Sequence, residues 1–177
     1  MRGLYRLLTR WWTAFALVAS LALLGFAHLS ETIWDIAPCN LCLKQREVYW
    51  GAVAVALVAT IWHLVSRGSR GTPRIAAFLL AVIFATGAIT AVFHMGGELK
   101  WWALPATCAA GGSVDLESMT ALALGTGPAP RVAMCDAVTW TFLGLSMAGW
   151  NALISAALAG FSLLAAKRPK DARAPRS

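Results

Sequence analysis

Charged residues are scarce in this chain of 177 residues, where Asp, Glu, Lys and Arg together make up 13% against 59% hydrophobic residues. The mean hydropathy is +0.65, far from the average of a soluble domain, so the composition excludes an ordinary water-soluble protein. The chain also has no Gly-rich phosphate-binding loop and no patch of interleaved basic and aromatic residues. These absences argue against a nucleic-acid partner. We interpret the net charge of +7 as a membrane topology signal and as contact with anionic lipid.

Charge is absent from four stretches that are long enough to cross a bilayer, whose hydrocarbon core of about 30 Å needs roughly 20 helical residues. Their apolar side chains lie on all helix faces, as lipid-embedded helices require. No ionisable residue lies mid-membrane to mark a translocation path, which argues against a transporter. The stretches are Trp11–Ser30, Val48–Val65, Ile75–Gly97 and a span inside Ala137–Ala166. We therefore predict an all-α membrane protein, a single four-transmembrane-helix bundle over residues 1–177, with helices over about 11–30, 44–65, 75–96 and 143–166.

The first apolar run follows three arginines, as the apolar region of a cleavable signal peptide would. However, no convincing small-x-small cleavage site follows it, and it exceeds the usual length of such a region, about 7 to 15 residues. Three further spans come after it. We interpret the run as a retained transmembrane helix.

Basic residues are unevenly distributed between the two sides of the predicted bundle. Eleven of the fifteen Lys and Arg fall in the N-terminal tail, the loop between the second and third helices, and the C-terminal tail. A four-helix topology places these three segments on one side, and the positive-inside rule makes that side cytoplasmic. We therefore expect a multi-pass membrane protein with both termini in the cytoplasm.

All four cysteines then lie on the opposite, oxidising side, which is the distribution typical of disulfides. Cys39 and Cys42 fall in the first outer (periplasmic) loop, and Cys108 and Cys135 fall in the second, over about 97–138. The second loop is rich in Gly and Pro. We expect at most one short helix in it, over 114–124, with a plain solvent-side linker as the alternative.

The first pair forms the motif Pro38-Cys39-Asn40-Leu41-Cys42-Leu43-Lys44-Gln45-Arg46. Two thiols at this spacing close a small disulfide ring, so the motif is a candidate two-electron redox switch. Such a ring restrains the unfolded chain little and is readily reduced, which argues against inert structural disulfides. The other two cysteines, 27 positions apart, do not form the second close pair of a structural zinc site. We predict no metal site, and the sequence does not choose among the three pairings of four cysteines.

Arg46 makes the redox interpretation more specific. If the second helix starts near Cys42, Arg46 lies four residues further on the same face. The helix N-terminus and the guanidinium both favour the thiolate of Cys42, which is the nucleophilic form. The guanidinium is equally able to donate hydrogen bonds to a carbonyl oxygen of a bound quinone. Snorkelling at the membrane interface is the simpler alternative.

Together these features resemble the disulfide bond formation protein B (DsbB) family of bacterial inner-membrane quinone reductases. The resemblance covers nearly the whole chain. It rests on the motif from Pro38 to Arg46, the order of the four cysteines, the four-helix topology, the stretch Phe142-Leu143-Gly144-Leu145-Ser146, and His94 near the outer end of the third helix. It implies a thiol:quinone oxidoreductase that generates protein disulfides, with ubiquinone or menaquinone as its cofactor.

The resemblance also implies a relay of disulfides. A reduced periplasmic thioredoxin-like oxidase (DsbA type) would form a mixed disulfide with Cys108, and the freed Cys135 would attack Cys39. Cys42 would then be released as a thiolate that faces the quinone. The implied catalytic residues are Cys39, Cys42, Cys108 and Cys135, and the implied quinone-binding residues are Arg46, Cys42 and His94. For His94, interfacial packing is an equal alternative.

Two other hypotheses fit parts of the sequence. A vitamin K epoxide reductase-like protein also couples thiols to a quinone in a four-helix bundle, but that family carries its Cys-x-x-Cys late in the chain, and here it comes early. A non-enzymatic membrane scaffold or chaperone with structural disulfides would bind no quinone.

Overall fold

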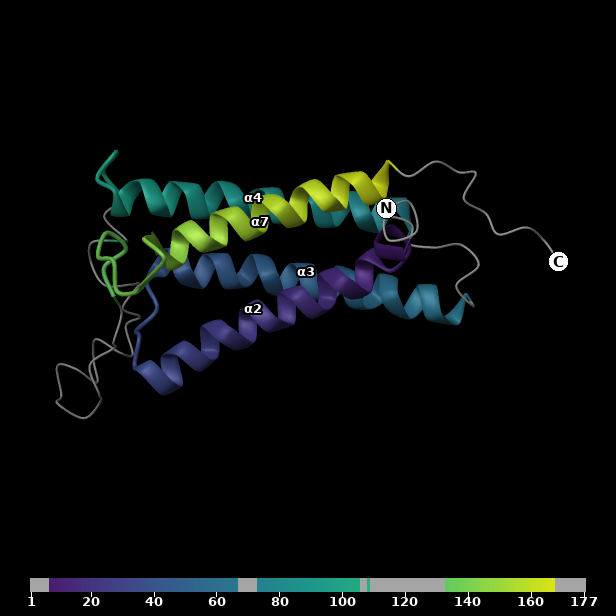
Figure 1. Ribbon diagram of the computed structural model, residues 1–177, viewed down its shortest axis with the longest axis horizontal. Coiled ribbons are helices and arrows are strands. Elements are labelled where there is room, and N and C mark those ends of the chain that lie inside the picture. Colours follow the sequence, from purple (N-terminus) through teal and green to yellow (C-terminus); the bar gives the residue numbers. More distant parts are fainter. Residues whose placement is uncertain (1–6, 67–72, 106–107, 109–132, 168–177) are drawn as a thin grey trace, which may run out of the picture.

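The computed structural model describes residues 7–66, 73–105, 108 and 133–167. Its long helices are α2 (Trp12–Trp34), α3 (Asn40–Val65), α4 (Arg74–Glu98) and α7 (Met147–Ala166), shown in Figure 1. All four are long and apolar enough to cross a membrane, which confirms the predicted four-helix membrane bundle. The short helix expected over 114–124 lies outside the described residues.

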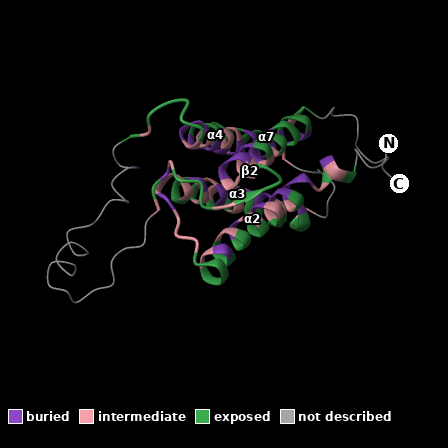
Figure 2. Ribbon diagram, turned by 60° about the vertical axis from the view of Figure 1, so that its left-hand side comes forward, coloured by how far each residue is buried: buried purple, intermediate pink, exposed green. Residues whose placement is uncertain are grey.

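Small residues occupy the interior of the bundle. Helix α4 packs along α7, and α3 packs against both α2 and α4. The buried positions, purple in Figure 2, are dominated by Ala, Ser and Gly, which allow helix backbones to approach closely. Large apolar side chains such as Val58, Ile75 and Ile89 point outward, where the lipid would lie. The bundle is therefore held by close packing and by a few interhelical hydrogen bonds, such as the one that Trp12 Nε1 donates to Ser162 Oγ at 2.9 Å.

Two helices extend further at the cysteine end of the bundle than hydropathy predicts. Helix α3 begins at Asn40 rather than at residue 44, because the Cys39 side chain caps it by accepting a hydrogen bond from the backbone N–H of Cys42. Helix α2 continues past residue 30 to Trp34 and ends where Asp35 adopts a left-handed conformation, with φ of 51°. Polar residues mark the end of the apolar stretch, but they do not end the helix.

The start of α7 is shifted in the opposite direction, from the expected residue 143 to Met147. Residues 141–146 instead form a small antiparallel hairpin of β1 (Thr141–Phe142) and β2 (Leu145–Ser146). Its two central residues, Leu143 and Gly144, both have positive φ, which is the pattern of a tight type I′ turn. The Ser146 hydroxyl then caps α7 by accepting a hydrogen bond from the N–H of Gly149 at 3.1 Å.

Candidate functional site

The four cysteines lie at the end of the bundle where α2 and α4 end and α3 and α7 begin, on the left of Figure 1. Cys39 and Cys42 lie at the start of α3, and Cys108 and Cys135 lie in the segment between α4 and α7. Cys39, Cys108 and Cys135 form one buried cluster, in which each is less than 5% exposed. Cysteines that are far apart in the sequence thus share one small volume.

Residues 99–105, which follow α4, fold back over the last turn of that helix. Gly97 permits this, because a Cβ at that position would lie 2.5 Å from the side chain of Leu104. Lys100 forms an ion pair with Asp136 at 2.6 Å, which holds the pKa of that carboxyl below its ordinary value. The backbone N–H of Cys135 donates a hydrogen bond to the carbonyl of Cys108 at 3.4 Å.

The structure shows the cysteines as free thiols. Cys39 donates a hydrogen bond to Cys42, with the two sulfurs 2.8 Å apart. This hydrogen bond, together with burial, raises the pKa of Cys39 well above its ordinary value. In the second pair, burial and a hydrogen bond with Cys135 raise the pKa of Cys108 to about 12. One thiol of each pair therefore keeps its proton strongly.

His94, on α4, contacts both cysteine pairs. Its Nε2 lies 3.6 Å from the sulfur of Cys39 and 3.1 Å from the carbonyl oxygen of Cys135. Its Nδ1 lies 3.1 Å from the side-chain nitrogen of Gln45, on α3. If Gln45 donates this bond, Nε2 carries the ring proton and faces the sulfur of Cys39. Glu98, one turn further along α4, lies 3.8 Å from the same nitrogen.

A chain of polar side chains extends from His94 into the bundle. Asn151, on α7, donates to the side-chain oxygen of Gln45 and accepts a hydrogen bond from Tyr49, on α3. Ser155 closes the group, with its hydroxyl 2.8 Å from that of Tyr49 and 3.2 Å from the oxygen of Asn151. These bonds join α3, α4 and α7 and fix the orientation of the imidazole.

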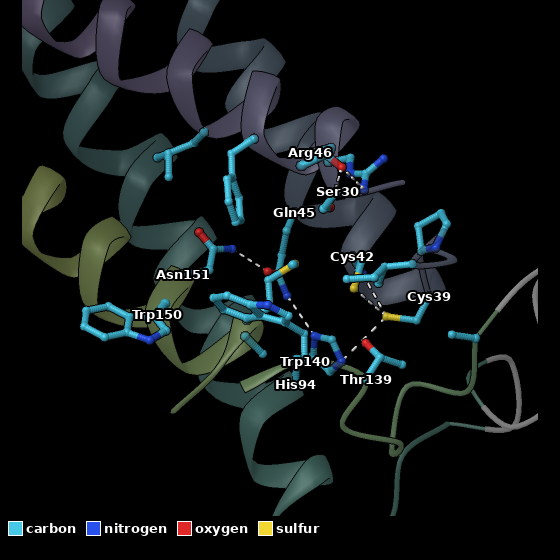
Figure 3. Close-up of a pocket in the computed structure, with 18 of the residues that line it drawn as sticks. Ser30, Cys39, Cys42, Gln45, Arg46, His94, Thr139, Trp140, Trp150 and Asn151 are labelled. Atoms are coloured by element: carbon cyan, nitrogen blue, oxygen red, sulfur yellow. Dashed lines mark hydrogen bonds between the residues drawn. The ribbon is translucent and has the colours of Figure 1, made fainter. Parts of the chain in front are cut away.

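A mostly apolar pocket of about 530 Å³ opens beside Cys39 and Cys42 (Figure 3). Residues from all four helices and from the segment 133–142 line it, including Cys39, Cys42, His94 and the aromatic side chains of Trp140 and Trp150. Its polar lining includes Arg46 and His94 as well as Gln45 and Asn151. A hydrophobic pocket with a few convergent polar groups is typical of a site for a small molecule.

Arg46 lies on the wall of this pocket with its side chain 13% exposed. Its guanidinium forms an ion pair with Glu31 at 2.6 Å and donates a hydrogen bond to the carbonyl of Ala27 at 3.3 Å, both on α2. These contacts engage two of its nitrogens, and a guanidinium carries five N–H donors. The side chain is therefore held in place by α2 and retains donors for a ligand.

The structure thus gathers the residues singled out in the sequence. Cys39, Cys42, Arg46 and His94 line one pocket, and Cys108 and Cys135 pack with Cys39 in the buried cluster. Sequence analysis missed four polar residues that hold these side chains in place, namely Glu31, Gln45, Glu98 and Asn151. Each of them is a polar side chain near the end of an otherwise apolar helix. That position was the signal in the sequence, because polar side chains in membrane-spanning helices are expensive and mark functional sites.

Comparison with known proteins identifies the family. The family model described as disulfide bond formation protein DsbB matches residues 9–165. The chain belongs to the DsbB family. It is 32% identical over 164 residues to the disulfide bond formation protein B of Aromatoleum aromaticum, which covers 88% of this chain and 90% of that protein. It is 33% identical over 166 residues to the protein of that name from Marinobacter nauticus, which covers 88% and 87% of the two chains. No solved structure gives a significant match.

Membership in the DsbB family identifies the chain as a multi-pass membrane oxidoreductase of disulfide bond formation. It favours this function over the vitamin K epoxide reductase-like alternative, in agreement with the early position of the Cys-x-x-Cys pair. The family uses a quinone, so the pocket beside Cys42 is the first place to test for one.

Proposed function

We propose that this protein reoxidises a periplasmic thioredoxin-like oxidase of the DsbA type and passes the electrons to a membrane quinone, either ubiquinone or menaquinone. The observation that carries the proposal is the contact of His94 Nε2 with both cysteine pairs, 3.6 Å from the sulfur of Cys39 and 3.1 Å from the carbonyl of Cys135. Cys39 also packs with Cys108 and Cys135 in one buried cluster, so the two pairs lie next to each other. Cys42, the remaining thiol, lines the pocket.

The pocket residues fit a quinone headgroup. Its walls are mostly apolar and partly aromatic, as a flat ring requires, and polar side chains such as Arg46 and His94 suit a ring carbonyl. Arg46 and Cys42 lie one helical turn apart on that wall, with His94 opposite them on α4. When bound, the quinone supplies a two-electron, two-proton acceptor. Arg46 would orient its carbonyl by hydrogen bonding and stabilise negative charge beside Cys42.

The first half of the relay starts from disulfides in both pairs. A thiolate of the reduced partner attacks the sulfur of Cys108, the Cys108–Cys135 bond breaks, and Cys135 leaves as the thiolate. Cys135 then attacks Cys39, the Cys39–Cys42 bond breaks, and Cys42 leaves. For these two attacks, the raised pKa values of Cys108 and Cys39 make Cys135 and Cys42 the better leaving groups of their disulfides.

The second half restores the outer disulfide. The second thiol of the partner attacks the partner's own sulfur in the mixed disulfide, which completes the partner's disulfide and releases Cys108. Cys108 then attacks Cys135 in the Cys135–Cys39 bond and releases Cys39. The net result is an oxidised partner and a reduced Cys39/Cys42 pair, which must lose two electrons and two protons into the pocket before the next cycle.

The same proposal sets the orientation in the membrane. The partner and its clients are exported proteins, so the cysteine end of the bundle faces the periplasm and both termini face the cytoplasm. The distribution of Lys and Arg supports this orientation in the bacterial inner membrane.

The test is quinone reduction by the purified protein with a reduced thioredoxin-like periplasmic oxidase as the electron donor. We expect Cys42→Ser to abolish turnover. Arg46→Ala should lower kcat/KM for the quinone by about 10- to 100-fold, since a hydrogen bond from a charged group contributes about 1.5 to 3 kcal/mol. Lys44→Ala is the matched control, because Lys44 is an exposed base on the same helix that pairs with Glu47.

The relay order has its own test. Cys108→Ser should prevent reoxidation of the partner, while a small dithiol that reaches the Cys39/Cys42 disulfide directly should still support quinone reduction. Full partner reoxidation by Cys108→Ser would overturn the assignment of Cys108. No turnover by the folded parent with either quinone would favour the scaffold hypothesis instead.

A further inference from the structure

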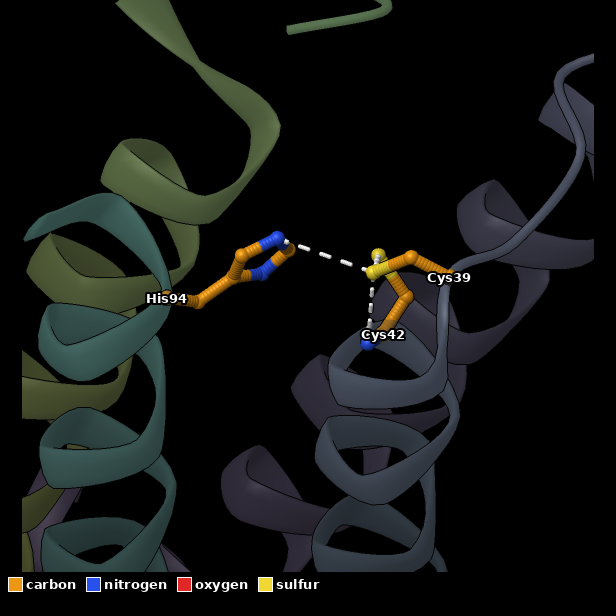
Figure 4. A group of neighbouring side chains, drawn as sticks. All are labelled: Cys39, Cys42 and His94. Atoms are coloured by element: carbon orange, nitrogen blue, oxygen red, sulfur yellow. Dashed lines mark hydrogen bonds between the residues drawn. The ribbon is translucent and has the colours of Figure 1, made fainter. Parts of the chain in front are cut away.

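Three potential metal ligands converge on the pocket from two helices. The sulfur atoms of Cys39 and Cys42 and the Nε2 of His94 all lie within 4.8 Å of one another (Figure 4). We propose that the reduced Cys39/Cys42 pair and His94 form a zinc-binding site that exists only while the pair is reduced. This proposal departs from the sequence-based prediction of no metal site. The site differs from the structural zinc site that the cysteine spacing argues against, because its third ligand comes from α4.

The distances are close to those of a tetrahedral zinc centre. With Zn–S of about 2.3 Å and Zn–N of about 2.05 Å, a sulfur and a nitrogen ligand lie about 3.6 Å apart and two sulfurs about 3.8 Å apart. The sulfur of Cys39 is already 3.6 Å from His94 Nε2. The two sulfurs, at 2.8 Å, must separate by about 1 Å. Rotation of the partly buried Cys42 side chain would provide this separation and would also bring its sulfur, which lies within 4.8 Å of the His94 nitrogen, to about 3.6 Å from it.

The buried surroundings favour a neutral metal complex over two uncompensated thiolates. Two thiolates and Zn²⁺ give a neutral group, so the complex adds no net charge to a buried site. The backbone N–H of Cys42 already donates to the sulfur of Cys39 at 3.2 Å, and a zinc-bound thiolate would accept the same hydrogen bond. Cys-x-x-Cys is also the usual spacing of paired zinc ligands.

Gln45 supplies the outer support that a histidine ligand needs. Metal at Nε2 leaves the ring proton on Nδ1, which lies 3.1 Å from the Gln45 amide. Reversal of that amide turns its oxygen towards Nδ1, and Asn151, its other partner, is an amide that can reverse with it. The reversal keeps the Gln45 and Asn151 amides paired, while metal at Nε2 would replace the hydrogen bond of that nitrogen to the carbonyl of Cys135.

The consequence is a redox-gated block. A disulfide sulfur is not a zinc thiolate ligand, so the oxidised pair would release the metal. In the reduced protein the bound metal would hold both thiolates and keep them from losing electrons. Zinc would thus arrest the protein in its reduced form, and the open fourth position would be filled by water.

The test uses Co²⁺, which takes the same geometry as zinc and gives sulfur-to-metal charge-transfer absorption with thiolate ligands. Full-length protein in detergent is reduced with a phosphine, freed of reductant and titrated with Co²⁺, without quinone or partner. We expect one Co²⁺ per chain with that absorption, displaced by Zn²⁺. The oxidised parent, which is the same folded chain, should show none.

Variants identify the ligands. Cys39→Ser/Cys42→Ser should lose the absorption, and His94→Ala and His94→Gln should each weaken Co²⁺ binding at least 10-fold. Cys108→Ser/Cys135→Ser should retain it. The proposal is overturned if the reduced parent gives no charge-transfer absorption, if the histidine variants bind as tightly as the parent, or if the signal depends on Cys108 and Cys135. Because the assay needs no turnover, either result leaves the quinone proposal to be judged by its own experiment.

Discussion

Replacing Asn151 tests whether the polar chain between α3 and α7 stabilises the bundle. Asn151 donates to Gln45 and accepts from Tyr49 across the helix interface, and it accepts from Ser155 within α7 at 3.2 Å. Interhelical hydrogen bonds in membrane proteins contribute about 0.6 kcal/mol on average and about 1.7 kcal/mol at most. Loss of the two interhelical bonds in Asn151→Ala should therefore lower the free energy of unfolding by about 1 to 3 kcal/mol.

The measurement is unfolding in mixed detergent with increasing denaturing detergent, followed by the fluorescence of the nine tryptophans. Thr86→Val is the matched control, because the Thr86 hydroxyl is exposed and donates only to the carbonyl of Val82 in its own helix. The control should stay within about 0.5 kcal/mol of the parent. If Asn151→Ala were as stable as Thr86→Val, the polar chain would not stabilise the bundle.

Asn151→Ala should also affect the chemistry. Without Asn151, Gln45 loses the partner that fixes its amide, and His94 loses the fixed contact at Nδ1. We expect slower disulfide exchange between the two cysteine pairs, measured by quenching the reaction with acid and counting alkylated cysteines. Normal exchange in a variant that is measurably destabilised would show that the network stabilises the bundle but does not position His94.

Three further predictions concern the surroundings of the site. Gly97→Ala should destabilise the protein by about 1 to 3 kcal/mol in thermal unfolding, because the new Cβ meets the side chain of Leu104. Gly160→Ala is the control, because a Cβ there meets open space, and it should leave the stability unchanged. Equal stability of the two variants would contradict the close approach at Gly97. The pKa of Cys108 is raised from 9.0 to about 12, so its thiolate should still be forming above pH 9. The rate of alkylation of this thiol in the reduced protein, followed by mass spectrometry, should therefore keep rising above pH 9. A plateau of the rate below pH 10 would refute this. Glu31→Gln should lower the quinone KM severalfold, because it removes the carboxylate that offsets the guanidinium charge 2.6 Å away; an unchanged or higher KM would contradict the charge argument.

Hydropathy predicted the four long helices but not the residues at which they begin and end. At Cys39 and at Ser146 the end of a helix is set by a side chain that caps it, and at residues 141–146 a tight turn delays α7. Both effects depend on local geometry that an average over twenty apolar residues does not contain. The redox motif was recognisable because its two cysteines and its arginine are separated by fixed steps along one helix.

The sequence by itself determined the membrane environment, the number of spans, and the presence of a redox-active cysteine pair. Backbone groups in lipid must be satisfied within helices, so long uncharged runs have one structural outcome. Only the tertiary structure decided that His94 lies between the two cysteine pairs, that Glu31 binds Arg46, and that Asn151 supports Gln45. These helices are apolar on every face, so the sequence carries little information on which face turns inward. That rotation is set by the packing of small residues between helices, and it determines which polar side chains meet at the site.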